Sequence, residues 1–441
     1  MMFRNRMLLV GVAALALSGC AVFKGHHRKT PVLGERIPIL AAENDVIADR
    51  TIADVQVVLP PPEVNDSWAQ PGGSASKATG HLALGANVSR AWTAQVNGGS
   101  NRQRLAASPV VADGKLFVTD VDGVVHAFTA DGGGKLWSTA IAKGDKHSAS
   151  ARFGGGVSYD AGSVYATDGL GDVVALNATN GTELWRAKPG APLRGAPTIA
   201  NGNVFVLSQD NQLYALGQAD GKQSWTQSGS IESQGVFGVA APASSQGTVV
   251  AGFSSGELSA YRYENGRTLW QDALSRSSVT TSVSSLADID ADPVIDRGVV
   301  YALGQGGRMV ALDIATGQRL WEQNFAGLST PSVAGEWVFI VTDDSRLVCL
   351  ARSTGKVRWI SQLRHYRVDK KHKDPITWYG PVLAGGRLVL TNSLGEIVFA
   401  ATDTGVVGQT IDTKTPFSLG PIVANSTLYT LDQKGHITAY R

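Results

Sequence analysis

Cysteine is scarce in this sequence, with two among 441 residues, at positions 20 and 349. So low a count excludes a small fold held together by several disulfides. Charge is also modest, since 17% of the residues are charged and the formal net charge is +2. Because nucleic-acid binding depends on a strong positive field, we do not expect the chain to bind DNA or RNA.

Motifs of common catalytic and metal sites are missing as well. The sequence contains no H-E-x-x-H or C-x-x-C pattern. Residues 288–292 begin like a calcium-binding loop, but Pro293 stands where such a loop needs glycine and Val299 where it needs glutamate. The sequence therefore predicts no catalytic residue, no metal site and no cofactor.

The N-terminal residues have the pattern of an export signal. Arg4 and Arg6 precede an apolar stretch at residues 7–17, which is too short for a permanent membrane span. The following Leu17-Ser18-Gly19-Cys20 resembles the lipobox of bacterial lipoproteins, in which the cysteine is acylated and the chain is cleaved just before it. We expect residues 1–19 to be a signal peptide and Cys20 to carry lipid. An ordinary cleaved signal with a chance cysteine is the alternative.

Residues 20–85 lack sustained periodicity and include the run Pro60-Pro61-Pro62. This composition predicts a lipid-anchored tether that is flexible or extended. The short apolar run at residues 55–59 leaves open an extra packed strand. Ala21 follows the anchor in place of aspartate, and by resemblance to lipoproteins this implies release to the outer membrane.

From residue 86 to residue 441 the chain repeats one unit of four short strands separated by Gly, Asn and Asp turns. Successive units begin 38 to 51 residues apart, a period typical of propeller blades. The opening site of the unit falls at Pro109, Gly156, Pro197, Pro242, Pro293, Pro331, Pro381 and Pro421. The sequence therefore predicts an all-β protein, an eight-bladed β-propeller of four-stranded blades.

The two ends of the repeat region predict how the ring closes. The last unit stops at its third strand, residues 437–441, whereas an isolated Trp-bearing strand, residues 88–94, precedes the first complete unit. We expect this N-terminal strand to complete the last blade and remove an exposed edge. The regularly spaced tryptophans are interpreted as packing between blades, and a ligand-binding aromatic set is the alternative.

The repeat signature A-L-D-x-x-T-G-x-x-x-W resembles the pyrroloquinoline-quinone propeller repeat. One group with this repeat is the quinoprotein dehydrogenases, which hold a calcium-bound quinone and typically carry two adjacent cysteines, and this chain has no such pair. The other is the BamB family, lipoproteins of the outer-membrane β-barrel assembly machinery. The lipobox, residues 86–441 and two loop motifs resemble the BamB family.

The two loop motifs supply the candidate partner-binding residues. Residues 192–197 resemble a family loop with the sequence S-L-R-G, and residues 286–294 resemble L-S-D-V-D-x-x-P-V. The resemblance implies that Leu193, Arg194, Asp288 and Asp290 dock the POTRA domains of BamA, the barrel subunit. Ala191 stands where the family has a further leucine. The alternative is that these side chains pair within the propeller and only hold its loops.

The resulting expectation is a non-enzymatic scaffold lipoprotein that faces the periplasm from the outer membrane. It would dock BamA, assist the insertion of barrel proteins and contact their unfolded chains. A quinone-dependent oxidoreductase and a propeller that binds cell-wall material or another envelope protein remain open. The basic residues 364–373 predict a solvated loop, or one that contacts lipid headgroups or a partner.

The Cys20→Ser substitution tests the anchor. The variant should be uncleaved or soluble, because acyl chains attached to the thiol contribute about 0.8 kcal/mol of membrane binding for each buried CH₂. The measurement is fractionation of cell envelopes with a mobility assay for signal cleavage. A processed Cys20→Ser protein in the outer-membrane fraction would contradict the assignment.

Overall fold

The computed structural model describes residues 46–100, 103–144, 148, 151–230, 240–274 and 288–441. These residues are mostly strands and turns, and Val46–Arg441 forms one compact unit. Two single 3-10 turns, η2 (Arg50–Ile52) and η4 (Asp369–Lys371), lie within its described residues. No helix in the described part is long and apolar enough to cross a membrane. The expected lipid anchor, Cys20, lies outside the described residues.

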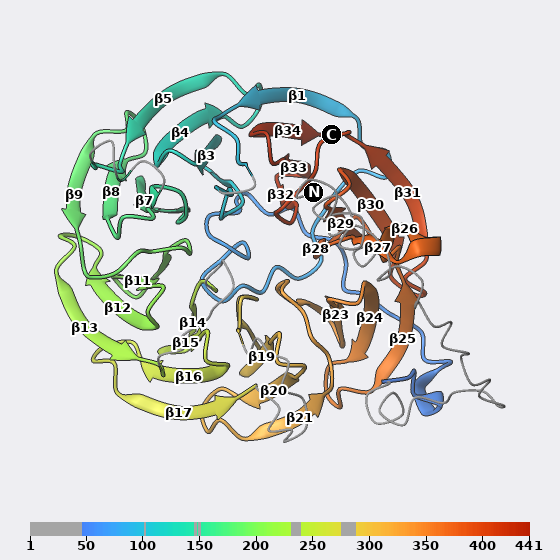
Figure 1. Cartoon of the computed structure of the whole chain (residues 1–441). Helices are drawn as coiled ribbons and strands as arrows, with labels where there is room; N and C mark the ends of the chain where they lie inside the picture. Colours follow the sequence, from blue (N-terminus) through green and yellow to red (C-terminus); the bar gives the residue numbers. More distant parts are fainter. Residues whose placement is uncertain (1–45, 101–102, 145–147, 149–150, 231–239, 275–287) are drawn as a thin grey trace, which may run out of the picture. The chain divides into compact units, whose positions relative to one another are not determined.

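The strands of this unit form a ring of eight four-stranded antiparallel sheets, which confirms the predicted eight-bladed propeller (Figure 1). Blade 1 holds β2 (Val110–Ala112), β3 (Lys115–Thr119), β4 (Val124–Thr129) and β5 (Lys135–Ala140). Blade 2 holds β6 (Val157–Asp160), β7 (Ser163–Thr167), β8 (Val173–Asn177) and β9 (Glu183–Ala187). Blade 3 holds β10 (Thr198–Ala200), β11 (Asn203–Leu207), β12 (Gln212–Gly217) and β13 (Gln223–Ser228). Blade 4 holds β14 (Ala243–Ser245), β15 (Thr248–Gly252), β16 (Glu257–Arg262) and β17 (Thr268–Ala273).

The second half of the ring continues the same pattern. Blade 5 holds β18 (Val294–Asp296), β19 (Val299–Leu303), β20 (Met309–Asp313) and β21 (Arg319–Gln323). Blade 6 holds β22 (Ser332–Ala334), β23 (Trp337–Val341), β24 (Arg346–Ala351) and β25 (Val357–Gln362). Blade 7 holds β28 (Trp378–Ala384), β29 (Arg387–Asn392), β30 (Glu396–Ala401) and β31 (Val407–Asp412). Blade 8 holds β32 (Ile422–Ala424), β33 (Thr427–Leu431), β34 (His436–Tyr440) and the N-terminal strand β1 (Arg90–Gln95).

The ring closes in blade 8, where the two ends of the repeat region meet. Strand β1 pairs antiparallel with β34, with Thr93 opposite Thr438 and Gln95 opposite His436. The outermost strand of this blade therefore comes from the start of the repeat region, and its other three strands come from the end. This pairing confirms the predicted closure and leaves no unpaired edge on β34.

Neighbouring blades are joined by tryptophans on their outermost strands. In seven blades the indole Nε1 donates to a main-chain carbonyl in the turn between the third and fourth strands of the next blade, at 2.8–3.1 Å. The donors are Trp92, Trp137, Trp185, Trp225, Trp270, Trp321 and Trp359. These contacts support the interpretation of the tryptophans as packing between blades.

A glycine in each receiving turn explains the T-G of the repeat signature. Gly317, for example, has a φ of +71°, and a Cβ atom there would lie 2.5 Å from the Trp270 ring. The equivalent glycines of the other six turns would place a Cβ atom 2.4–2.7 Å from the preceding tryptophan. Any larger residue would both strain the turn and push the indole away from the next blade.

Residues 65–85, referred to as the inner segment, run along the inside of the ring (Figure 1, blue). Each innermost strand has one edge that its own blade does not pair, and equivalent N–H groups in blades 1 to 5 donate to the inner segment. Four of these N–H groups donate to main-chain carbonyls: Val111 to Trp68 (2.9 Å), Tyr159 to Ala69 (2.7 Å), Ser244 to Ala75 (2.8 Å) and Ile295 to Ser76 (2.8 Å). The fifth, the N–H of Ile199, donates to the side-chain oxygen of Gln70 (2.9 Å).

The same segment also contacts the last two blades. The Leu82 N–H donates to the carbonyl of Leu383 in blade 7 at 3.1 Å, and the Asn425 N–H of blade 8 donates to the carbonyl of Asn65 at 2.7 Å. Trp68 is 5% exposed and Leu82 is 4% exposed. The compact unit thus begins at Val46, earlier than the predicted boundary at residue 86. The expected tether was flexible or extended, whereas residues 46–85 belong to the compact unit and the main chain of the inner segment pairs with strand edges.

Gln70 is a direct test of this pairing. Its side chain donates to the Ile199 carbonyl (3.0 Å) and accepts from the Ile199 N–H (2.9 Å), and both residues are buried. Gln70→Ala should lower the free energy of unfolding by about 2 kcal/mol, because it leaves two buried main-chain groups without a partner. Gln271→Ala, at an exposed position on β17, is the matched control. Equal denaturant midpoints for the two variants would contradict a stabilising role of the inner segment.

Candidate functional site

The candidate docking loops lie on one face of the propeller. One precedes β10 and the other precedes β18, and both join an outermost strand to the innermost strand of the next blade. In an antiparallel blade of four strands all such connections leave from the same side, which we call the connection face. Gly195, Ala196 and Asp290 line one central cavity of about 410 Å³. The loops of blades 3 and 5 therefore border the same space.

Leu193 is packed inside the propeller. Its exposed fraction is 0%, and it lies in a core cluster with Tyr165, Val206 and Tyr214. Its main chain forms a bridge with Ser208 of blade 3. In the described structure Leu193 therefore holds the loop in place and does not present an apolar surface to a partner.

Arg194 spans two blades and is partly buried. Its guanidinium donates to the carbonyl of Phe153, lies 4.6 Å from the centre of the Phe153 ring, and donates through Nε to Gln209 at 3.3 Å. Burial lowers the pKa of Arg194, and Asp168 acts in the opposite direction. The side chain thus has contacts within the propeller, as the alternative interpretation expects, while part of it stays accessible.

The two aspartates of the second loop differ in exposure. Asp288 is 1% exposed, and Ile289 beside it is buried between blades 4 and 5. Asp290 is partly exposed and lines the cavity, and Gln305 donates to its carboxylate at 3.4 Å. Burial and the nearby carboxylates of Asp288 and Asp343 raise the pKa of Asp290 to about 7. Asp290 is therefore the aspartate of this pair that is open to the cavity.

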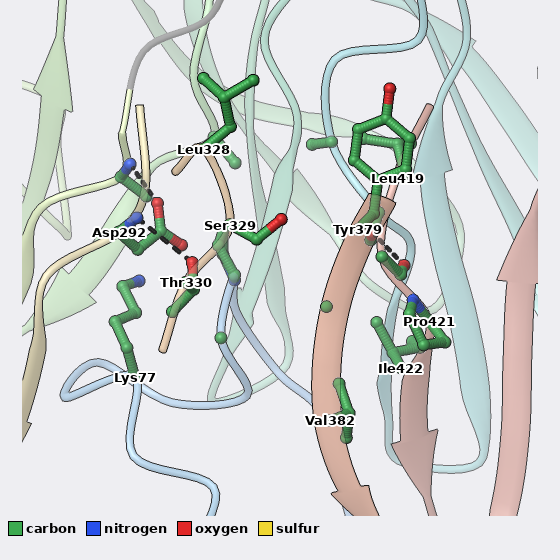
Figure 2. Close-up of a pocket in the computed structure, with 18 of the residues that line it drawn as sticks. Lys77, Asp292, Leu328, Ser329, Thr330, Tyr379, Val382, Leu419, Pro421 and Ile422 are labelled. Atoms are coloured by element: carbon green, nitrogen blue, oxygen red, sulfur yellow. Dashed lines mark hydrogen bonds between the residues drawn. The ribbon is translucent and has the colours of Figure 1, made fainter. Parts of the chain in front are cut away.

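Sequence reasoning missed a buried lysine and its carboxylate neighbour in the same cavity. Lys77 of the inner segment is 2% exposed, and its ammonium donates to the hydroxyl of Thr198 at 3.0 Å. The Asp292 carboxylate accepts from the Ala241 N–H at 2.7 Å, while its own N–H donates to Thr330 (Figure 2). Burial lowers the pKa of Lys77 to about 8, although the Asp292 charge opposes the shift. A lone lysine in a Gly- and Ser-rich stretch carries no signal that would have revealed this position.

The described residues offer little for redox or metal chemistry. They contain no group of three or more His, Cys, Asp or Glu side chains arranged to hold a metal ion. Cys349, the cysteine within the described part, is buried, and burial raises the pKa of its thiol. A calcium-bound quinone needs a set of oxygen ligands, and the residues described here do not fit one.

Asp290 gives the site a measurable pH dependence. Its pKa is near 7 when folded and near 3.8 for an unperturbed aspartate, so its contribution favours folding below about pH 4 and is lost as the pH rises to 7. Asp290→Asn should raise the free energy of unfolding at pH 8 by about 1 to 2 kcal/mol, after discounting for solvent screening. The gain should vanish near pH 4, as measured by denaturant unfolding across pH. Asp403→Asn, in an exposed turn, is the control; a gain from Asp290→Asn that does not depend on pH would contradict the argument.

Comparison with solved structures identifies the fold. The crystal structure of BamB from Moraxella catarrhalis matches with a TM-score of 0.65 at 17% identity, covering 81% of this chain and 98% of that one. Quinohemoprotein alcohol dehydrogenase from Comamonas testosteroni also matches with a TM-score of 0.65, at 13% identity, covering 85% of this chain and 80% of that one. At these identities the likeness shows the propeller fold and does not separate a scaffold from an oxidoreductase.

Comparison of sequences identifies the family. A family model described as outer membrane protein assembly factor BamB matches residues 121–361. The protein of that name from Salmonella typhimurium is 31% identical over 79% of this chain and 87% of its own length, and the one from Escherichia coli K12 is 30% identical over 77% and 85%. The Yersinia pestis protein is 26% identical over 99% of both chains. Because these matches cover more than half of its length, the chain belongs to the BamB family of outer membrane protein assembly factors.

Proposed function

We propose that this protein is a non-enzymatic scaffold of an outer-membrane protein assembly complex, held to the membrane by lipid on Cys20 and facing the periplasm. The observation that carries the proposal is the meeting of two loops, those of Arg194 and Asp290, at one cavity on the connection face. The names of the relatives, outer membrane protein assembly factors, support the same role. By the family resemblance, the partner is BamA and the contact is with its POTRA domains.

The four candidate residues divide into two groups by their exposure. Arg194 and Asp290 are partly exposed and can meet a partner directly, whereas Leu193 and Asp288 are buried. Arginine suits this role because its planar guanidinium carries five N–H donors in a fixed geometry that matches a carboxylate. Leu193 and Asp288 would act by holding the loops in the conformation that presents Arg194 and Asp290.

A scaffold role also agrees with the chemistry of the cavity. Lys77 donates to Thr198, and Asp292 accepts from a main-chain N–H, so both charged groups have partners inside the protein. Groups held in this way organise the cavity wall. The same cavity wall fixes the loops of blades 3, 4 and 5 relative to one another.

Charge reversal at the two exposed positions tests the docking surface. Arg194→Glu and Asp290→Lys should each weaken co-purification of BamA by at least about tenfold, because a favourable contact is replaced by repulsion. Both variants should stay folded, since loop residues with partial exposure carry little of the core. Co-purification from solubilised envelopes, with thermal melts of the same preparations, gives both quantities.

Three further variants separate docking from folding. Lys222→Glu reverses an exposed charge on the opposite face and should leave BamA binding unchanged. Arg194→Lys keeps the charge without the planar group, so it should retain part of the binding. Leu193→Ala should lower stability by about 2 to 5 kcal/mol, so any loss of binding would be accompanied by a lower melting temperature. Full co-purification of BamA with folded Arg194→Glu and Asp290→Lys variants would remove the docking assignment.

A further inference from the structure

A basic hairpin projects from the connection between blades 6 and 7. Strands β26 (Tyr366–Val368) and β27 (Lys373–Pro375) pair antiparallel, and η4 forms the turn between them. Because this connection also joins an outermost strand to an innermost one, the hairpin lies on the connection face. Figure 1 shows it at the outside of the ring, beside β31. The hairpin contains the basic residues 364–373, for which the sequence left open a solvated loop, a contact with lipid headgroups or a contact with a partner.

The hairpin is held to the propeller at its base. The buried Trp378 donates through its indole to the carbonyl of Arg364 at 3.0 Å. The Arg364 guanidinium in turn donates to the carbonyls of Tyr366 (3.2 Å) and Arg367 (2.7 Å), and the Tyr366 ring stacks on His372 with centroids 5.1 Å apart. These contacts fix the two strands, so the other side chains of the hairpin start from a well-defined backbone.

The positive charges of the hairpin outnumber its negative ones. Its exposed cations are Arg364, Arg367, Lys370, Lys371 and Lys373, against two carboxylates, Asp369 and Asp374. Among the described residues none of these five cations lies within ion-pair distance of a carboxylate, whereas Arg186, Arg319 and Arg352 on the propeller body all do. A rigid, solvated cluster of unpaired cations attracts an anionic surface.

An apolar side chain stands at the tip of this cluster. Val368 ends β26 directly before η4 and is 40% exposed. Lys370 and Lys371 follow it within the same turn. Cations surrounding one exposed apolar residue suit the boundary between headgroups and acyl chains, where the ammonium groups meet phosphates and the apolar group enters the lipid.

We propose that this hairpin binds anionic phospholipid headgroups at the membrane surface. The proposal rests on the proposed function, because a lipid anchor near the N-terminus would keep the propeller beside such a surface. Headgroups fit better than an acidic protein surface, since the hairpin offers spread charges and one exposed apolar side chain. A specific protein interface is usually centred on a cluster of buried aromatic or arginine side chains. Each basic residue near an anionic leaflet adds a favourable contribution that salt weakens.

The test follows the hairpin tip in the mature lipoprotein reconstituted into vesicles. Val368→Cys is labelled with a polarity-sensitive fluorophore, and Cys349 stays unlabelled because it is buried. In phosphatidylcholine vesicles with about one third phosphatidylglycerol, the emission should shift to the blue and respond to a lipid-borne quencher. Phosphatidylcholine alone should give neither effect. Raising the salt concentration should reverse the shift.

Paired charge reversals identify the groups responsible. Lys370→Glu with Lys371→Glu should lower the bound-to-free ratio of the tip at least about tenfold. Lys135→Glu with Lys222→Glu reverses two charges beside turns of the opposite face and should change nothing. Equal signals in both kinds of vesicle, or no effect of the hairpin reversals, would overturn the proposal. A signal that appears only after BamA is added would assign the hairpin to a protein partner and overturn it equally.

Failure of the proposed function would look different. If Cys20 carries no lipid, the protein will not reconstitute, and co-sedimentation of the soluble labelled chain with the same vesicles then tests the hairpin. The hairpin reversals should leave co-purification of BamA unchanged, whereas the Arg194→Glu variant should lose BamA and keep its lipid-dependent signal. The docking surface and the lipid-binding hairpin can therefore fail separately.

Discussion

The contact between an indole ring and a glycine determines how the blades of this propeller are spaced. Each of seven outer-strand tryptophans packs on a glycine of the next blade and donates to a carbonyl of the same turn. The equivalent position in β31 is Gln409, at the interface with blade 8, where the turn is replaced by the ends of the repeat region. The tryptophan is thus absent at the one interface that has no receiving turn, which ties the repeat signature to a physical requirement.

The inside of the ring depends on a different interaction. Eight innermost strands meet around a central space, and each presents main-chain groups that its own blade does not pair. Water could satisfy these groups in an open channel. Here the inner segment accepts hydrogen bonds from the innermost strands of blades 1 to 5 and contacts blades 7 and 8. The cavity is therefore bounded on one side by the chain itself. Because Lys77 and Asp292 lie where this segment passes the loops, the N-terminal region also shapes the candidate docking site.

The repeats made the fold predictable from the sequence. Neither the inner segment nor the burial of the candidate site residues could be predicted in the same way. Eight opening sites and a displaced Trp strand were sufficient for the blade number and for the closure of β1 on β34. The inner segment was missed because it contributes mainly single main-chain hydrogen bonds, which leave no periodic pattern of side chains. Of the four candidate site residues, Leu193 and Asp288 are buried, because local spacing does not reveal which neighbour covers a side chain.

The same contacts explain why both candidate interaction sites occur on one face. On the face opposite, the turn between the third and fourth strands is five residues long in each of blades 1 to 7, and its glycine lies against an indole. An insertion there would separate two blades. The connections to the next blade have no such constraint, and they range from eight residues at 324–331 to twenty at 274–293. New loops and hairpins are therefore tolerated on the connection face, where they can acquire partners without disturbing the ring.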